Sequence, residues 1–218
     1  MQNFKTVYKE SEVELQISKS RFIGYVKPVE DESDAIRFIE KIKKKHWDAS
    51  HNVPVYVIGE NFGIQRATDD GEPSGTAGVP ILEMLKKEAI TDVCIVVTRY
   101  FGGVKLGTGG LVRAYTQSAK AALEAAEIVE KKVNILLKLD FDYHYHGKLQ
   151  NYFLGEPQII IKETFFTDRI SLEIYVEPEF EMGITNHIVE LTSGQVEIET
   201  IGSFYLTIKN EKVVESMV

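Results

Sequence analysis

The stretch from Thr98 to Tyr115, "TRYFGGVKLGTGGLVRAY", decides the organisation of this chain. Its eighteen positions hold five glycines, two arginines and one lysine. It follows "DVCIVV" (92–97), a continuous apolar run whose length predicts a strand covered on both faces. An alanine-rich helix through about Glu127 is expected next, with small side chains that permit close approach to a sheet. We therefore predict a strand, a glycine-rich loop and a helix within an α/β domain.

This loop predicts a site for an anion. Arg99 follows the strand directly, so we expect it at the carboxyl end of the strand, where open α/β sheets hold ligands. Glycines allow positive φ and leave the backbone open to a ligand, and the N–H groups at the start of a helix favour an anion. The alternative is a tight turn that serves packing alone, since neither the P-loop nor the dinucleotide fingerprint is matched. The predicted anion-binding residues are Arg66, Arg99, Tyr100, Gly102, Gly103, Lys105, Gly107, Gly109, Gly110 and Arg113.

A second glycine-rich segment, "ATDDGEPSGTAGVP" (67–80), precedes a short helix expected at 81–87. One interpretation is a turn followed by helix capping, with hydroxyl side chains as the caps. The other is functional, because carboxylates and hydroxyls beside a glycine loop can hold Mg²⁺ on a phosphate ligand. The accessory acidic or capping cluster comprises Asp69, Asp70, Glu72, Ser74 and Thr76.

Charge is spread unevenly along the 218 residues, whose formal net charge is −8. Up to Asn134 there are 19 basic and 19 acidic side chains, whereas 6 basic and 14 acidic ones follow. The first part can therefore hold a local basic patch for phosphates, and the acidic second part favours a protein partner. A single cysteine, Cys94, excludes internal disulfides and cysteine-rich zinc sites, and no metal site is predicted.

No apolar run reaches the length of a membrane span. The first sixteen residues, "MQNFKTVYKESEVELQ", lack the apolar core of a secretory signal. We therefore expect a cytoplasmic protein without a membrane partner.

Two domains are predicted, residues 1–134 and 135–218, which makes the fold class α+β. The second reads as strand, helix, strand, strand, helix, strand, the ferredoxin-like order. His144 and His146, two apart on a predicted strand, would face the same way, but no third ligand is placed near them, so we expect an exposed strand face and not a metal site.

Three stretches together resemble the IMPACT/YigZ family: "SKSRFIGYV" (18–26), "DDGEPSGTAGVPIL" (69–82) and "VVTRYFGGVKLGTGGLVRAYTQSAKAAL" (96–123). The resemblance implies a first domain of the type shared by a small-subunit ribosomal protein and elongation factor G. It also implies a ferredoxin-like second domain similar to a late domain of elongation factor G. The partner-mediated mechanism of the eukaryotic relatives is not expected here, because their extra N-terminal domain has no counterpart in this sequence. By motif position the resemblance implies a shared surface of Arg99, Tyr100, Phe101, Lys105 and Arg113, beside Asp69, Asp70 and Glu72.

Two functions are carried forward. The first, which the resemblance favours, is a non-enzymatic regulator of translation that binds RNA or the ribosome through the anion-binding surface and needs no cofactor. The alternative is an enzyme acting on a phosphorylated small molecule or nucleotide, with a kinase-like phosphate loop and Mg²⁺. In that case a carboxylate of the 69–72 segment would be the base or a Mg²⁺ ligand.

Overall fold

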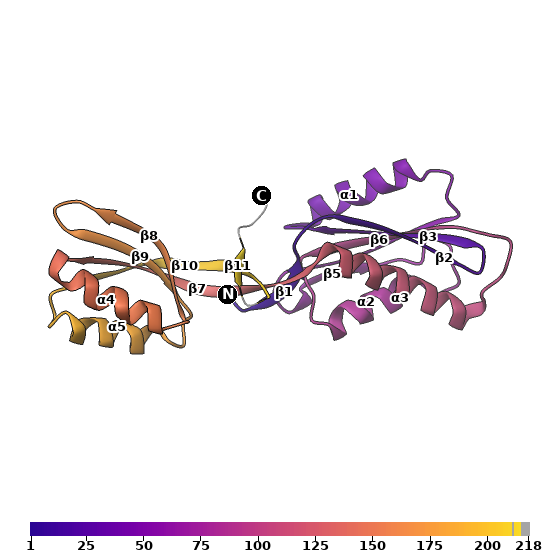
Figure 1. The fold of residues 1–218 in the computed structure, drawn as a ribbon. Helices are drawn as coiled ribbons and strands as arrows, with labels where there is room; N and C mark the ends of the chain where they lie inside the picture. The colour runs from indigo at the N-terminus through magenta and orange to yellow at the C-terminus, as the bar shows by residue number, and fades with distance from the viewer. Residues whose placement is uncertain (211, 215–218) are drawn as a thin grey trace. The chain divides into compact units, whose positions relative to one another are not determined.

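A computed structural model describes residues 1–210 and 212–214. The chain divides into two compact units, one formed by Met1–Lys131 with the described residues from Thr207 onward, the other by Lys132–Leu206. Within the described residues there are two sheets and five α-helices, so the predicted two-domain α+β class is confirmed (Figure 1). No α-helix of this part of the chain is both long and apolar enough to cross a membrane.

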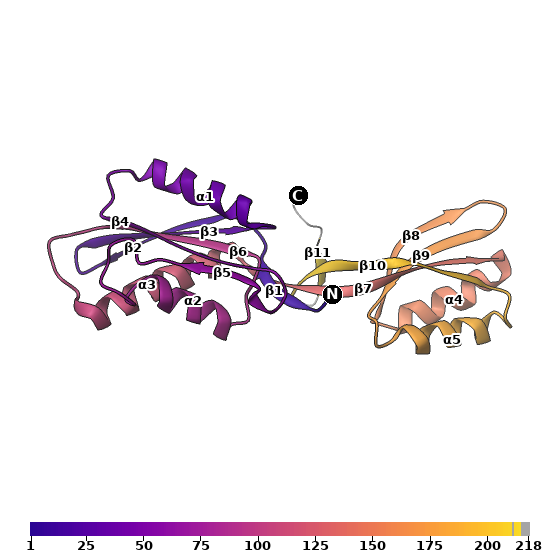
Figure 2. The same cartoon turned by 180° about the vertical axis from the view of Figure 1, so that it is seen from behind.

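The first unit is built on a five-stranded antiparallel sheet in the order β2-β3-β6-β4-β5. Helix α1 covers one face, and helices α2 and α3 cover the other (Figures 1 and 2). A 3₁₀ turn, Glu60–Phe62, joins β4 to β5. The bounds are β2 Ser11–Ile17, β3 Ser20–Pro28, α1 Glu32–Lys45, β4 His51–Ile58, β5 Ile64–Ala67, α2 Gly78–Lys87, β6 Val93–Tyr100 and α3 Gly107–Ala126.

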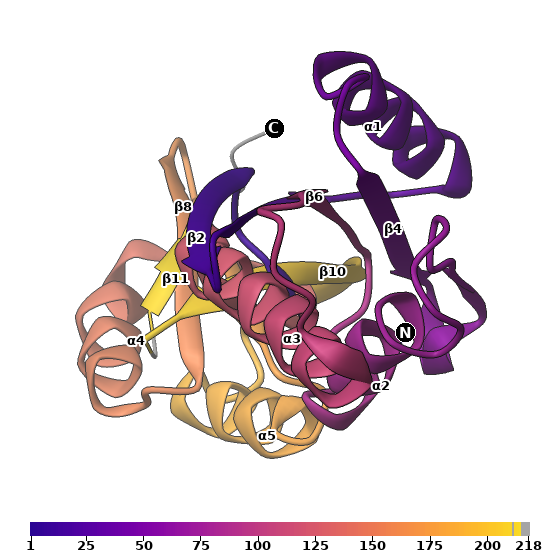
Figure 3. The ribbon, with the colours of Figure 1, turned by 90° about the vertical axis from the view of Figure 1, so that its right-hand side faces the viewer.

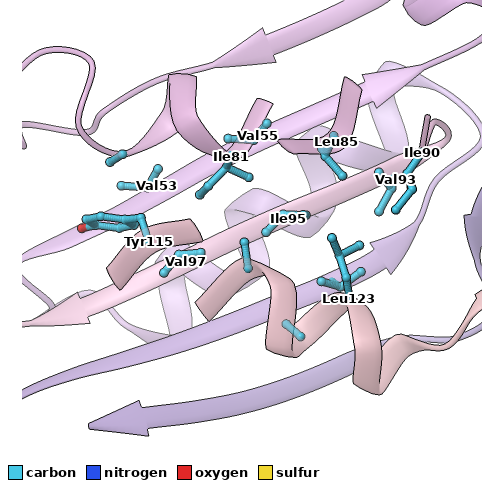
Figure 4. Packing of buried hydrophobic residues seen from close by; sticks show 14 of the residues in the cluster. Val53, Val55, Ile81, Leu85, Ile90, Val93, Ile95, Val97, Tyr115 and Leu123 are labelled. Carbon is cyan, nitrogen blue, oxygen red and sulfur yellow. The ribbon is translucent and has the colours of Figure 1, made fainter. Parts of the chain in front are cut away.

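Strand β6 is buried on both faces, as its apolar run predicted. Val93, Ile95 and Val97 belong to the core under α2 and α3, whereas Cys94 and Val96 belong to the core under α1. Figure 4 shows side chains of α2, α3 and β4 packed around the first of these sets. Because successive strand side chains point to opposite faces, this alternation fixes the direction of every side chain up to Tyr100.

Helix α3 lies close to β3, as its small side chains predicted. A Cβ atom on Gly24 of β3 would lie 2.7 Å from the carbonyl oxygen of Ser118 and 2.9 Å from the Cβ of Ala122. Ser118 and Ala122 are fully buried. Glycine on the strand and small residues on the helix therefore set the distance between the two elements.

The second unit has the predicted order of strand, helix, strand, strand, helix, strand. Its strands lie in the order β10-β7-β9-β8, and one core joins them to α4 and α5 on one side of the sheet (Figure 1). Strand β1, Phe4–Val7, pairs with the start of β7 within the first unit. The bounds are β7 Ile128–Phe141, α4 Tyr143–Gly155, β8 Ile159–Phe166, β9 Ile170–Val176, α5 Glu181–Leu191, β10 Glu197–Lys209 and β11 Lys212–Val214.

The second compact unit is shorter than the predicted domain 135–218, because β7 and β10 both cross the boundary between the units. At its start β7 belongs to the first unit, and there the ammonium of Lys131 donates to the hydroxyl of Thr207 at 2.7 Å. The ammonium of Lys209 pairs with Glu127. These contacts group the end of β10 with the first unit.

His144 and His146 lie in α4 and not on a strand, so that prediction was wrong. The alternating "LDFDYHY" pattern has high strand propensity, but the chain leaves the sheet at Asp142, and Leu149 and Phe153 of the new helix pack into the core. Tertiary packing outweighs strand propensity here. Among the described residues no group of three or more His, Cys, Asp or Glu side chains is arranged to hold a metal ion.

Candidate nucleic-acid interface

Four segments that are far apart in the sequence meet at one end of the first sheet (Figure 3). The register shows this, because His51 at the start of β4 pairs with Arg99 near the end of β6, and Arg21 at the start of β3 pairs with Tyr100. We call this region the loop end; it consists of the turn 18–19, residues 46–50, the loop 68–77 and the loop 101–106. All three stretches that resemble the IMPACT/YigZ family contribute to it.

Hydrogen bonds fix the start of the 101–106 loop against its neighbours. The N–H of Phe101 donates to the hydroxyl of Ser50 at 3.0 Å, and the N–H of Gly102 donates to the hydroxyl of Ser20 at 3.1 Å. A Cβ atom on Gly102 would lie 1.9 Å from the carbonyl oxygen of Lys19. Glycine at 102 is therefore required by the adjacent turn and not by a ligand.

Further along, the glycines have other roles. Gly103 and Gly107 adopt φ of +82° and +70°, which only glycine reaches without strain. A Cβ atom on Gly109 would meet no other atom within 4 Å. Helix α3 begins here with no side-chain cap and no acidic residue in its first turn. The N–H groups at the start of α3 therefore face an open surface formed by glycines.

Asp69 caps helix α2. Its Oδ1 atom accepts hydrogen bonds from the N–H groups of Ala77 at 3.0 Å and Gly78 at 2.9 Å, and its Oδ2 atom accepts one from Gly75 at 2.8 Å. Burial raises the pKa of Asp69, but these three bonds outweigh it and leave the pKa below its ordinary value. The N-cap position itself is Ala77, so Asp69 supplies from the preceding loop the hydrogen bonds that the sequence pattern predicts from hydroxyl side chains. Of those, Thr76 donates to the carbonyl of Pro73 at 2.6 Å, and Ser74 is exposed.

Asp70 joins the 68–77 loop to β4 and α1. Its Oδ2 atom accepts from the N–H of Asn52 at 2.6 Å, and its Oδ1 atom lies 3.2 Å from the ammonium of Lys43. Its carbonyl oxygen lies 2.7 Å from Nδ1 of His51. The polar groups of Asp70 are therefore occupied by the protein itself.

Glu72 and Arg99 form a buried ion pair beneath the loop end. Their side chains are 4% and 6% exposed, and Nη1 of Arg99 lies 2.6 Å from Oε1 of Glu72. The same oxygen accepts from the Tyr115 hydroxyl at 2.7 Å, and Nε2 of His51 lies 3.7 Å from it. Burial and this carboxylate both raise the pKa of Tyr115, which keeps the phenol protonated. The pair joins β4, β6, α3 and the 68–77 loop.

Arg99 is therefore a core residue. Its guanidinium lies 5.4 Å from the ring centres of both Phe22 and Phe101, and its Nε atom is buried with no hydrogen-bond partner among the described residues. A phosphate at the surface would have to displace Glu72 to reach Nη1. The guanidinium instead packs against the ring of Phe101, a residue that is 49% exposed.

The structure does not bring all predicted site residues to one surface. Arg99 points towards α2 and α3, whereas Tyr100 points towards α1, where its hydroxyl donates to Asp48 at 3.0 Å. Arg66 pairs across strands with Tyr56, which belongs to the core under α1, so it lies on the face opposite Arg99. Strand alternation therefore puts Arg66 and Tyr100 on one face of the sheet and Arg99 on the other, although the sequence predicted one site for all three.

Two cations of the loop end, Lys19 and Lys105, and two of the helices beside it, Lys44 of α1 and Arg113 of α3, have no protein partner among the described residues. In the part of the chain that the structure describes, no ion pair or hydrogen bond engages the side chain of Lys19, Lys44, Lys105 or Arg113, and all four residues are exposed. Arg113 is one turn after Gly109 on α3, and helical side chains lean towards the N-terminus. It is therefore placed to reach an anion above the glycines.

Sequence reasoning missed Trp47. It follows the last turn of α1 and is 83% exposed. The buried stripe of α1, Ala35, Phe38 and Ile42, continues to His46, which is 8% exposed. Extending the 3- and 4-residue spacing of that stripe places position 46 inside and position 47 outside, and this signal was available in the sequence.

Comparison with known proteins agrees with this organisation. Residues 18–123 match the Impact N-terminal domain, and residues 139–195 match a domain of unknown function (DUF1949). The first match contains all four segments of the loop end. The fold and this end thus define a two-unit α+β protein with an Impact-type first unit.

The chain belongs to the IMPACT family, as its motifs predicted. It is 47% identical over 199 residues to the IMPACT family member YvyE of Bacillus subtilis, with 91% of each chain covered. It is 37% identical over 131 residues to the IMPACT family member YigZ of Escherichia coli, covering 59% of this chain and 64% of that one. A solved structure described as "Crystal structure of an hypothetical protein" has a TM-score of 0.56 and 27% identity, covering 92% of this chain and 98% of that one.

Proposed function

We propose that this protein regulates translation without catalysing a reaction, by binding RNA or the ribosome through the loop end. Family membership favours a translation-regulator-like role. The observation that carries the binding site is a set of four exposed cations that have no partner within residues 1–210 and 212–214: Lys19, Lys44, Lys105 and Arg113. Of the nearby carboxylates, Asp70 pairs with Lys43 and Glu72 pairs with Arg99. Asp69 accepts three backbone N–H bonds and forms no ion pair with the four cations.

Two further features support this proposal. Phosphates are bound by Lys, Arg and free backbone N–H groups, and the uncapped start of α3 supplies the last of these beside Arg113. The strand order β10-β7-β9-β8 with two helices on one side agrees with a ferredoxin-like second domain. From the family resemblance we assign the first unit to the fold shared with a small-subunit ribosomal protein and elongation factor G. We also propose that the acidic second part binds a protein partner.

Arg99 has a different role in this proposal from the one predicted. It holds the loop end together from below through Glu72 and does not contact phosphate. The Tyr100 hydroxyl already donates to Asp48, and Arg66 lies within β5, so neither is assigned a phosphate contact. The phosphate contacts are assigned to the four unpartnered cations.

The experiment is to measure binding of the full chain to RNA as a function of salt. Each phosphate contact contributes roughly 0.7 to 0.9 to the slope of log K against log salt. Lys105→Ala and Arg113→Ala should each weaken binding and flatten the slope by about that amount. Lys87→Ala is the matched control, because Lys87 is exposed in the last turn of α2, at the other end of that helix from the loop end.

Two results would contradict the proposal. One is the absence of measurable RNA or ribosome binding at low salt, above all if a nucleotide with Mg²⁺ raises the melting temperature instead, since that would favour the enzyme alternative. The other is an equal loss of affinity in Lys87→Ala, because the effect would then reflect net charge and not the loop end.

A further inference from the structure

Trp47 is the only tryptophan of the chain, and it is the most exposed large apolar side chain of the described residues. Its backbone is held on both sides. Before it, the ring of His46 is buried and lies 2.6 Å from the Tyr25 hydroxyl and 2.9 Å from the Tyr100 hydroxyl. After it, Asp48 accepts the Tyr100 hydroxyl. The indole therefore projects from a fixed position.

Trp47 follows three lysines in the last turn of α1. Lys44, three residues earlier in the last turn of α1, has no partner among the described residues. Ser50, three residues later, accepts the N–H of Phe101, whose ring is half exposed and supported by Arg99. An exposed ring near a free cation is the chemistry that binds single-stranded nucleic acid, in which the cation contacts a phosphate and a base stacks on the ring.

We infer that the loop end binds unpaired RNA, with one base stacked on the indole of Trp47. This inference rests on the proposed function and names the form of RNA that the site takes. In a duplex the bases are paired and stacked on each other, so their faces cannot reach an indole. Phosphate contacts alone would not distinguish the two forms, whereas stacking on Trp47 favours the single strand.

The test uses the full chain, a 12-nucleotide single-stranded RNA and the same sequence in a duplex. Trp47 is the sole source of tryptophan fluorescence, so quenching reports directly on its contact with a base. We expect quenching by the single strand but not by the duplex. In anisotropy titrations with labelled RNA, Trp47→Ala should weaken single-strand binding by roughly 5- to 150-fold, the range for one stacked base. Trp47→Phe should retain most of the affinity.

The controls separate stacking from other effects. Leu154→Ala removes a comparably exposed apolar side chain, 81% exposed, from the second unit and should leave binding unchanged. Duplex affinity should be the same in Trp47→Ala and in the unmodified chain. Because Trp47 contributes little buried surface, circular dichroism should show that both variants fold.

Three outcomes would overturn the inference, and they differ from failure of the proposed function. If RNA binds with the expected salt dependence but the single strand neither quenches Trp47 nor is preferred, the inference fails and the proposed function stands. If Trp47→Ala abolishes co-sedimentation with ribosomes yet leaves RNA affinity intact, Trp47 contacts a protein. If the chain binds no RNA of either form, both fail.

Discussion

Removing the guanidinium of Arg99 should lower the stability of the first unit far more than substitution of an exposed residue would. Glu72, 4% exposed, would be left with the Tyr115 hydroxyl as its nearest hydrogen-bond donor. Breaking a buried ion pair by removing one partner costs about 3–5 kcal/mol, because the remaining charge is buried without compensation. Arg99→Ala should therefore lower the free energy of unfolding of this unit by about 3–5 kcal/mol.

The structure also indicates how to recover most of this loss. No residue that the structure describes accepts a hydrogen bond from the buried Nε of Arg99, so the pair is not optimal as it stands. Replacing both members with uncharged side chains of similar size is often neutral or stabilising. The double variant Arg99→Met with Glu72→Gln should therefore be more stable than Arg99→Ala, with a coupling of about 1–3 kcal/mol between the two sites.

Hydrogen exchange of the β6 amides provides the assay, because it reports on the first unit without averaging over the second. A loss of about 3–5 kcal/mol corresponds to exchange roughly 150- to 5,000-fold faster. If Arg99→Ala accelerated exchange by less than about fivefold, the claim that the buried ion pair is required for the stability of the first unit would be refuted. Loss of RNA binding with unchanged exchange would make Arg99 a phosphate ligand after all.

Three other predictions test the local structure. Asp69→Ala should cost about 0.5–2 kcal/mol through loss of the α2 cap, measured by urea unfolding, and Asp69→Asn should cost less; equal costs would argue against capping. Gly102→Ala should destabilise the first unit by about 1–3 kcal/mol or more, because the new Cβ would collide with the carbonyl oxygen of Lys19. Gly109→Ala should leave stability unchanged or raise it. Melting temperatures in the reverse order would contradict this. Burial lowers the pKa of His46 below 6.5, so its contribution to stability is complete above about pH 6.5 and is lost as the pH falls towards the lowered pKa. His46→Gln should therefore flatten the dependence of the unfolding free energy on pH in that window. An unchanged slope would show that His46 is not the group responsible.

The sequence alone determined the elements whose signal is local. The continuous apolar run of β6 predicted burial on both faces. The spacing of Ala35, Phe38, Ile39 and Ile42 is that of one face of a helix, and α1 buries three of these residues, because such patterns reflect which side of an element meets the core. The six-element order of the second unit and the family followed likewise from pattern and motif. The small residues of α3 predicted its close approach to the sheet, which Gly24 permits.

Tertiary structure decided which side chains are free to act. Arg99 and Tyr100 are neighbours in sequence, but the pleat sends one to Glu72 beneath α3 and the other towards α1. Glu72 is 27 positions from Arg99, and no local pattern encodes that pairing, because it depends on the register of β4, β6 and the loop between β5 and α2. The sequence placed the glycines and cations in one region; only the packed fold determined that Lys105 and Arg113 face solvent while Arg99 is neutralised in the core.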